Sequence, residues 1–318
     1  MKRLIPLFVL LSLSIVAGAQ VRPPVPRPSQ KATIMQQIGT TDISFTYSRP
    51  LVKGRTIFAD APAEMAARAK GEATLDDQNA RKAGEPIVPW DHVWRAGANE
   101  ATLFTTTDDI LVNGQLLPAG KYSFHTIPAK DGNWTIIFNK DDGQWGSFSY
   151  DAAKDQLRVK TKATTVPNSA ELLTYYFDDV KDDSATAVLR WEKMQVTFDI
   201  KVKDVVASTL GHLKAYVAAA KPDDPAAPLN AAMYAKSVKR NDEANAWFEQ
   251  ALRLNDAQIA QKETMQNLGR RATILLNLGR NAEALAAAEK AVTVGKAAGA
   301  DTSALEKRIA DLKAPKSN

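Results

Sequence analysis

The stretch that decides the fold is Met194-Gln195-Val196-Thr197-Phe198-Asp199-Ile200-Lys201-Val202-Lys203. Apolar side chains alternate with polar ones along its whole length, which is typical of a β-strand with one buried face. Just upstream, Leu189 and Trp191 have the opposite parity. Because one extra residue moves the side chains of a strand to its other face, we expect a β-bulge or a turn near Glu192-Lys193.

The same alternation recurs further upstream, beginning with Ile43, Phe45 and Tyr47. Asn113-Gly114 is a strong signal for a hairpin turn, because both residues tolerate a positive φ. Other predicted strands cover residues 103–107, 110–112, 121–127, 133–139, 145–150, 156–161 and 171–177. Short strands with tight turns and no intervening helices predict a β-rich antiparallel sandwich, jelly-roll-like, over residues 30–203.

Residues 59–85 interrupt this pattern. They are rich in alanine and in charged residues and show no alternation, although 63–69 could form a helical turn or two. We expect this segment to be an insert that forms a surface loop.

Helical spacing replaces the alternation from residue 204 onward. Residues 205–220 predict one helix, which the prolines at 222, 225 and 228 bring to an end. The segment Asp242-Glu243-Ala244 is similar to Ala282-Glu283-Ala284, and the two alanines at 244 and 284 are forty residues apart. This repeat resembles tetratricopeptide helix hairpins, although their period is about 34 residues. Residues 204–318 are therefore predicted to form an all-α helical-hairpin domain that ends in a helix at 302–313.

An apolar stripe runs through this helical region, made by Trp247, Phe248, Leu252 and Leu254. We expect it to form the core between hairpins, and a partner-binding groove is the alternative.

The amino terminus has the three parts of a signal peptide, predicted at residues 1–19. Lys2 and Arg3 precede an apolar run at 4–16, and Ala17-Gly18-Ala19 is a small-residue cleavage site. A proline-rich leader follows at residues 20–29. With no cysteine in the chain, we expect an exported protein of the periplasm or extracellular space, without lipid anchor, disulfide or thiol chemistry.

Charge and hydropathy narrow the range of partners. The formal charge of +5 falls by two, to +3, once Lys2 and Arg3 are removed, and basic and acidic residues are interspersed. Nucleic acid is therefore not an expected partner. After the signal peptide no apolar stretch approaches the roughly 20 residues that a membrane-spanning helix needs.

The densest run of aromatic, cationic and amide side chains is the segment 90–102. Within it, the Arg95 guanidinium suits a carboxylate or phosphate, and Trp90 or Trp94 suits a sugar or aromatic ring. The ligand-binding candidates are Tyr47, Arg49, Trp90, Trp94, Arg95, Asn99, Glu100 and His125. The alternative is architectural: Arg95 and Glu100 would form an internal ion pair, and the two tryptophans would belong to the core.

His125 is expected on the face of its strand that also carries Lys121 and Ser123, as an ordinary surface histidine. As a general base it would need Glu100 or Asp108 as a neighbour. The chain has three histidines and no His-x-His or His-x-x-x-His spacing, so no metal site is predicted, and no cofactor.

Several of these pieces carry a resemblance to a family of exported bacterial proteins catalogued as domain of unknown function 2911. The matching segments are 37–39, 47–50, 54–58, 93–102, 117–123 and 134–139. The resemblance covers about residues 29–202 and implies the fold and the exported location, without an assigned activity. A helical tail is common in this family, whereas the insert at 59–85 departs from its shorter members.

Catalytic signatures are missing from the sequence: there is no Gly-x-Ser-x-Gly elbow, phosphate-binding glycine loop or Ser-x-x-Lys box. We therefore expect an exported, non-enzymatic binding or scaffold protein, with helical hairpins for protein contact. The alternative is a carbohydrate-binding or carbohydrate-active protein that uses Trp90 or Trp94 and Glu100, the latter paired with Asp91 or Asp108. A third hypothesis makes the β domain a spacer for the helical tail.

Overall fold

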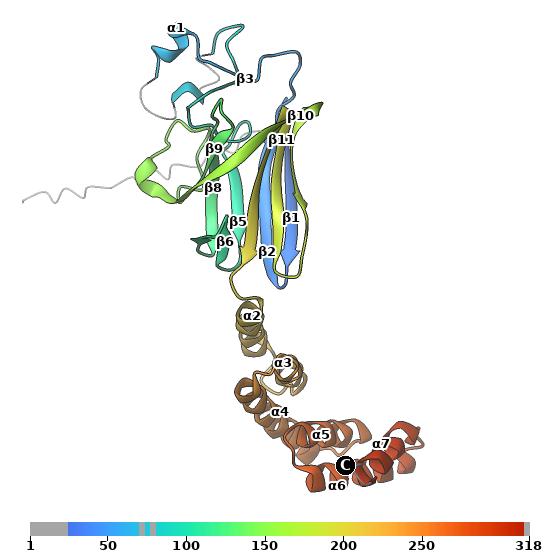
Figure 1. The fold of residues 1–318 in the computed structure, drawn as a ribbon. Coiled ribbons are helices and arrows are strands. Elements are labelled where there is room, and N and C mark those ends of the chain that lie inside the picture. Colours follow the sequence, from blue (N-terminus) through green and yellow to red (C-terminus); the bar gives the residue numbers. More distant parts are fainter. Residues whose placement is uncertain (1–24, 70–73, 77–80, 315–318) are drawn as a thin grey trace, which may run out of the picture.

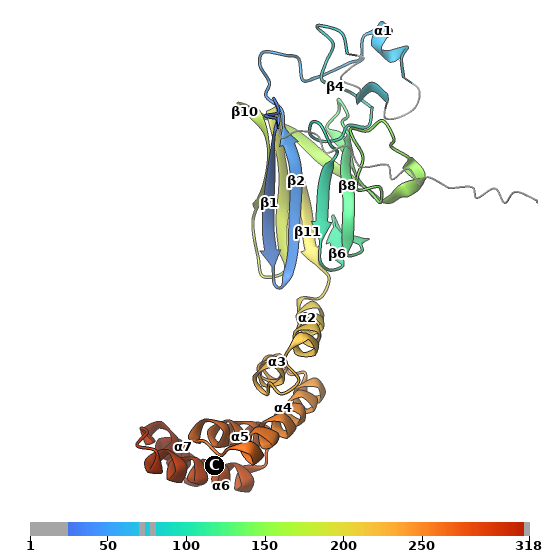
Figure 2. The same ribbon diagram turned by 180° about the vertical axis from the view of Figure 1, so that it is seen from behind.

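The structure is a computed structural model that describes residues 25–69, 74–76 and 81–314. The predicted signal peptide and residues 20–24 of the leader lie outside this range. Figures 1 and 2 show a β domain at one end of the molecule and a curved row of helices at the other. No helix among the described residues is long and apolar enough to cross a membrane.

In the described part of the chain, nine strands form one antiparallel sheet in the order β1-β2-β5-β8-β9-β10-β11-β6-β7. Their bounds are β1 (Gln30–Ile38), β2 (Thr41–Arg49), β5 (Thr102–Thr106), β6 (Ile110–Val112), β7 (Gln115–Leu117), β8 (Gly120–Ile127), β9 (Asn133–Asn139), β10 (Asp155–Asp178) and β11 (Ser184–Val202). A short parallel pair, β3 (Phe58–Ala59) and β4 (Val88–Pro89), borders the insert. The insert itself contains α1 (Ala63–Ala66) and the 3₁₀ turn η1 (Thr74–Asp76), and a second 3₁₀ turn, η2 (Ala152–Lys154), precedes β10.

The sheet folds over on itself into two packed layers. Strands that are not neighbours in the sheet meet through their aromatic rings: Phe45 of β2 stacks on Tyr175 of β10 at 4.8 Å, and Phe124 of β8 on Phe198 of β11 at 5.7 Å. These fully or almost fully buried rings belong to one continuous apolar core. The predicted antiparallel β-rich domain followed by a helical domain is confirmed.

Two details of the strand prediction are wrong. The segments 156–161 and 171–177 are parts of the single long strand β10. Residues 145–150 form turns instead of a strand, and their chain folds back over β8. Alternation identifies pleated backbone but carries no information on how far a strand continues through a bend.

The expected bulge lies in β11 at Glu192, whose φ is +51°. Met194 pairs with Thr165 on one side of it, and Arg190 pairs with Thr174 on the other, with a register shift between them. Because of this shift, the side chains of Trp191 and Val196 both point into the same core, although one residue has an odd and the other an even number.

The helices are α2 (Val205–Ala219), α3 (Ala226–Ser237), α4 (Asn241–Gln261), α5 (Met265–Asn277), α6 (Asn281–Ala297) and α7 (Ser303–Lys313). Asp204 caps α2 by accepting from the Ala207 amide at 2.9 Å, and Thr264 with Asn267 forms a capping box on α5. Buried alanines at 244, 251, 284 and 288 let the paired helices approach closely around Phe248. The predicted stripe residues Trp247, Phe248 and Leu252 belong to this core.

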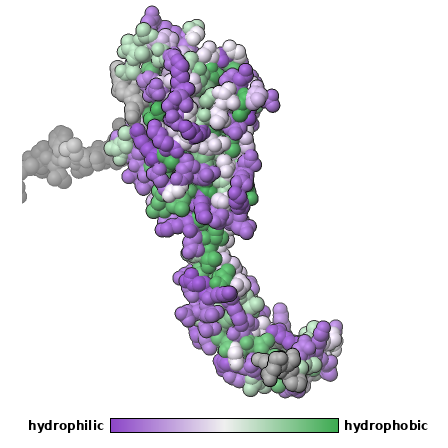
Figure 3. Space-filling model, in the orientation of Figure 1, coloured by the Kyte–Doolittle hydropathy of each residue, from purple (hydrophilic) through white to green (hydrophobic). Residues whose placement is uncertain are grey.

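Helix α2 joins the two domains at the end of the sheet opposite the insert (Figures 1 and 2). Thr209 lies 3.2 Å from Thr40 between hydroxyl oxygens, and His212 Nε2 lies 3.2 Å from an Asp108 carboxylate oxygen. A Cβ on Gly39 would come within 2.6 Å of Val205, so only glycine fits this junction. On the face drawn in Figure 3, hydrophobic residues gather at this neck, between surfaces that are mostly hydrophilic.

Candidate functional site

The insert covers the end of the β domain opposite α2, and its described parts are anchored there. Met65, Leu75 and Asp76 are each at most 4% exposed. The expectation of a plain surface loop is therefore wrong for these residues, because all three are buried and Asp76 pairs with Arg95 of the segment 90–102. The insert thereby forms one wall of the site.

The buried charged group is Asp76, the partner of Arg95. The Arg95 guanidinium is 1% exposed and donates to Asp76 Oδ2 through Nε at 2.8 Å, to the Asp76 carbonyl through Nη2, and to the Asn99 carbonyl at 2.8 Å. The Arg95 backbone amide also donates to Asp76 Oδ2, at 3.1 Å. Gly146, with φ +65°, closes over this pair, since a Cβ there would lie 2.9 Å from the guanidinium.

The predicted ion pair between Arg95 and Glu100 is thus wrong. Arg27 is the partner of Glu100, with 2.7 and 2.9 Å to its two carboxylate oxygens. Burial alone would raise the pKa of Glu100, but hydrogen bonds from Arg27 and from backbone more than offset it and hold this pKa below its usual value. Glu100 is therefore ionised at neutral pH, which does not suit a general acid.

His125 belongs to a buried polar chain that sequence reasoning missed. Ser147 Oγ donates to Asp76 Oδ2 at 2.9 Å, so it must accept from His125 Nδ1 at 3.1 Å. His125 Nε2 then accepts from Ser123 Oγ at 2.9 Å. The expectation of a surface histidine is wrong, because the loop that carries Ser147 covers this face of β8 and leaves His125 fully buried.

Burial lowers the pKa of His125 to about 3, with a further lowering by the nearby Arg95 charge, so the imidazole is neutral at physiological pH. A serine stands between the carboxylate and the imidazole, which differs from the order of a nucleophilic triad. Ser123 and Ser147 are both 0% exposed. The chain from Asp76 to Ser123 thus ties together the insert, the loop after β9 and β8.

Tyr47 and Arg49 connect β2 to β10. The Tyr47 hydroxyl accepts from the Tyr175 amide at 3.1 Å, and Arg49 donates to the Leu173 carbonyl at 2.9 Å and to Thr174 Oγ1 at 2.8 Å. Both candidates therefore make contacts across the core.

The other candidates in the segment 90–102 have protein neighbours too. Trp90 stacks on Phe58 at 5.6 Å between centroids, and Trp94 stacks on Trp191 at 5.7 Å. Asn99 adopts a φ of +62° and donates to the Ser29 carbonyl at 3.2 Å.

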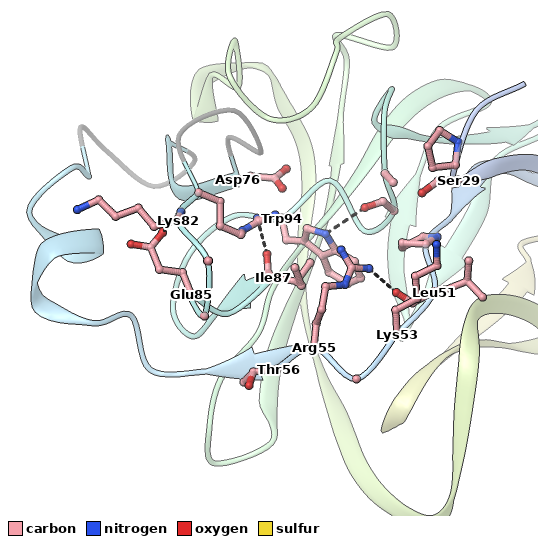
Figure 4. A pocket seen from close by; sticks show the side chains of 18 residues that line it. Ser29, Leu51, Lys53, Arg55, Thr56, Asp76, Lys82, Glu85, Ile87 and Trp94 are labelled. Carbon is pink, nitrogen blue, oxygen red and sulfur yellow. Dashed lines mark hydrogen bonds between the residues drawn. The ribbon is translucent and has the colours of Figure 1, made fainter. Parts of the chain in front are cut away.

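A cavity of about 770 Å³ opens between the insert, the segment 50–56 and the segment 94–98 (Figure 4). Trp94 is the one ligand-binding candidate in its wall, and Arg95 and His125 lie behind Asp76. The charged wall residues are Lys53, Arg55, Asp76, Arg81, Lys82 and Glu85. Sequence reasoning missed this group, because its members come from two segments that meet only in three dimensions. A net basic composition in 53–55 and 81–82 is the one local signal.

The fold and this site define a two-domain chain in which an antiparallel β domain carries a partly covered cavity and a helical-hairpin domain extends from its other end. The chain belongs to the family described as "Protein of unknown function (DUF2911)", whose model matches residues 29–200. The match confirms the resemblance and spans β1 to almost the end of β11. No curated protein and no solved structure matches the chain.

Proposed function

We propose that this protein is an exported, non-enzymatic binding protein whose β domain holds a small ligand and whose helical hairpins contact a protein partner. The observation that carries the proposal is the cavity of about 770 Å³ under the insert. Ligand sites in proteins commonly have volumes of about 300–1,000 Å³ and combine apolar surface with a few polar groups. Leu51, Ile87 and Trp94 supply such apolar surface here.

Binding fits the site better than turnover does, because its acidic groups and its histidine are already engaged by other protein groups. Arg95, Asp76 and His125 are hydrogen-bonded into one buried chain. In the cavity wall, the hydrogen bond from Arg68 holds the pKa of Glu85 below its usual value, so this carboxyl carries no proton to donate at neutral pH. A catalytic acid or base needs a pKa near the working pH.

The helical domain supports the second half of the proposal. Its hairpins resemble tetratricopeptide units, whose stacked helices commonly present a binding surface. Tyr216 of α2 and Met233 of α3 are exposed large apolar residues, with relative accessibilities of 50% and 46%. Exposed large apolar side chains suit contact with a protein. The exported location rests on the predicted signal peptide and the resemblance.

A ligand screen by thermal shift tests the proposal. Compounds that raise the melting temperature of the mature chain should lose their effect in Thr56→Trp, because the indole would fill the cavity from its exposed rim. Thr164→Trp is the matched control, since Thr164 is an exposed threonine on β10 outside this wall. A hit that stabilises both variants as well as the wild type would contradict binding in the cavity.

Carbohydrate binding remains the second candidate, and one observation favours it. Trp145 is 44% exposed, and its backbone forms an isolated antiparallel β-bridge with that of Glu100. The Arg27 guanidinium carbon lies 5.7 Å from the centroid of the Trp145 ring. An exposed indole beside a carboxylate and a guanidinium suits a sugar ring. Oligosaccharides should then quench the tryptophan fluorescence of the wild type and leave Trp145→Ala unaffected. A flat titration of the wild type would exclude this candidate.

A further inference from the structure

The two carboxylates in the wall of the cavity are already neutralised by protein cations. Asp76 holds the buried Arg95 guanidinium at 2.8 Å. Glu85 accepts from Arg68 at 2.6 Å and from the Lys82 amide at 2.9 Å. Asp76 and Glu85 therefore already have their own cationic partners, Arg95 and Arg68.

Three wall cations have side chains that make no ion pair among the described residues. Arg55 donates to the carbonyls of Val52 and Leu51. Arg81 donates through Nη2 to the Ile87 carbonyl at 2.7 Å. Lys53 uses its backbone amide to reach Glu171, and its ammonium group makes no ion pair in the described part of the chain. Lys82 differs from these three, because its ammonium pairs with Glu64 at 2.6 Å.

Arg81 is the most constrained of the three. Its Nε atom is buried and has no hydrogen-bond partner. Burial lowers the pKa of Arg81, and the positive charges of Arg95 and Arg55 lower this pKa further. The negative charge of Asp76 raises it, but not enough to offset the lowering. A buried N–H donor without an acceptor is destabilising, and more so when the group is charged. A negative charge bound beside Arg81 would offset the cost of burying its guanidinium charge and would reduce the repulsion from Arg95 and Arg55.

Figure 4 shows the side chains that line this cavity. Arg55 projects between the segment that carries Lys53 and the segment that carries Ile87, and Lys82 and Glu85 stand on the opposite side of the cavity. Leu51, Ile87 and Trp94 add apolar surface to the same cavity. The wall therefore offers a cationic region next to an apolar one.

We infer that the ligand of this cavity is a small molecule with an apolar body and one anionic head, a carboxylate or a phosphate, that Arg81, Arg55 and Lys53 bind. The inference rests on the proposed function and deepens it. Guanidinium groups suit both heads, because their planar N–H donors match two oxygens at once.

Isothermal titration with octanoate, octanol and inorganic phosphate tests this assignment on the mature chain. Octanoate should bind and octanol, which has the same chain length without the charge, should not. Binding of inorganic phosphate alone at millimolar concentration would show that the cationic region of the cavity also accepts a phosphate as the anionic group of the ligand. Added salt should weaken the binding of octanoate, since screening reduces attraction between partly exposed charges.

The variants Lys53→Met and Arg55→Met should each weaken octanoate binding about tenfold, the loss expected for one charge-assisted contact. Both side chains are exposed, so both variants are expected to fold. Lys140→Met is the matched control and should bind like the wild type, because Lys140 is exposed outside the cavity. Arg81→Met should show the largest loss, and its melting curve reports whether it is folded.

Octanol binding as tightly as octanoate would overturn the anionic ligand and leave the proposed binding function intact. Unchanged octanoate affinity in Lys53→Met and Arg55→Met would do the same. If neither an anionic probe nor any compound of the thermal-shift screen depends on the cavity, the proposed function itself is wrong.

Discussion

The two ends of the molecule are stabilised in different ways. At the insert end, a buried ion pair and a chain of polar groups join segments far apart in the sequence, from Asp76 through Ser147 to His125. In the helical domain, small apolar residues such as Ala244 and Ala251 pack around Phe248 within consecutive hairpins. The difference shows that one chain can join distant segments through a buried ion pair in one domain and consecutive hairpins through close apolar packing in the other.

Arg95→Ala should have the largest effect, and it should be confined to the β domain. Removing one partner leaves the Asp76 carboxylate buried and without its cation, which costs about 3–5 kcal/mol. Urea unfolding followed by tryptophan fluorescence measures this, because five of the six tryptophans lie in the β domain. A loss below about 1 kcal/mol would mean that this pair behaves like a surface pair.

Ala251→Leu should have a smaller effect, on the helical domain. Ala251 is fully buried between hairpins, and extra methyl groups there should force the helices apart at a cost of about 1–3 kcal/mol. Helical circular dichroism during urea unfolding measures the loss. Ala246→Leu, at an exposed alanine on the same helix, should stay within about 0.5 kcal/mol of the wild type. Equal effects would contradict close packing at position 251.

His125 makes the stability of the insert end depend on pH. Its pKa is about 3 in the folded state, below the unfolded value of about 6.5, so the unfolded chain takes up this proton first. Stability is therefore fully present above about pH 6.5 and falls by about 1.4 kcal/mol per pH unit below it. His125→Gln should have a shallower slope between these two values than the wild type in urea unfolding. Parallel slopes would show that His125 does not carry the effect.

Arg27→Ala should have the smallest effect. Its ion pair with Glu100 is partly exposed, at 43% and 37%, so water and salt screen it and the loss should stay below about 1 kcal/mol. The same fluorescence assay gives a direct comparison with Arg95→Ala. A larger loss would indicate that the leader helps to hold the β domain together.

Periodicity was enough to predict much of the fold. The parity change between Trp191 and Val196 located the bulge at Glu192, because a pleated strand has a strict period of two. The helical hairpins followed in the same way from the spacing of small and apolar residues. Both patterns are local, so a single sequence contains them.

The candidate site was predicted only in part, and the reason is physical. Segment 90–102 was singled out for its aromatic, cationic and amide side chains, but Asp76, the partner of Arg95, comes from a segment without any periodic pattern. Alternation in β8 also placed His125 on the face opposite Tyr122 and Phe124, yet it could not show that a loop covers that face. Contacts between loops depend on the path of the whole chain.

The cavity and the junction with α2 lie at opposite ends of the β layers (Figure 1). Strand β2 runs between them and has nine residues, which at about 3.4 Å per residue spans about 30 Å. A small molecule under the insert and a protein docked on the hairpins would therefore have no atoms in contact. Under the proposed function, such a chain would act as a tether, in which each end could be occupied or empty without steric competition from the other.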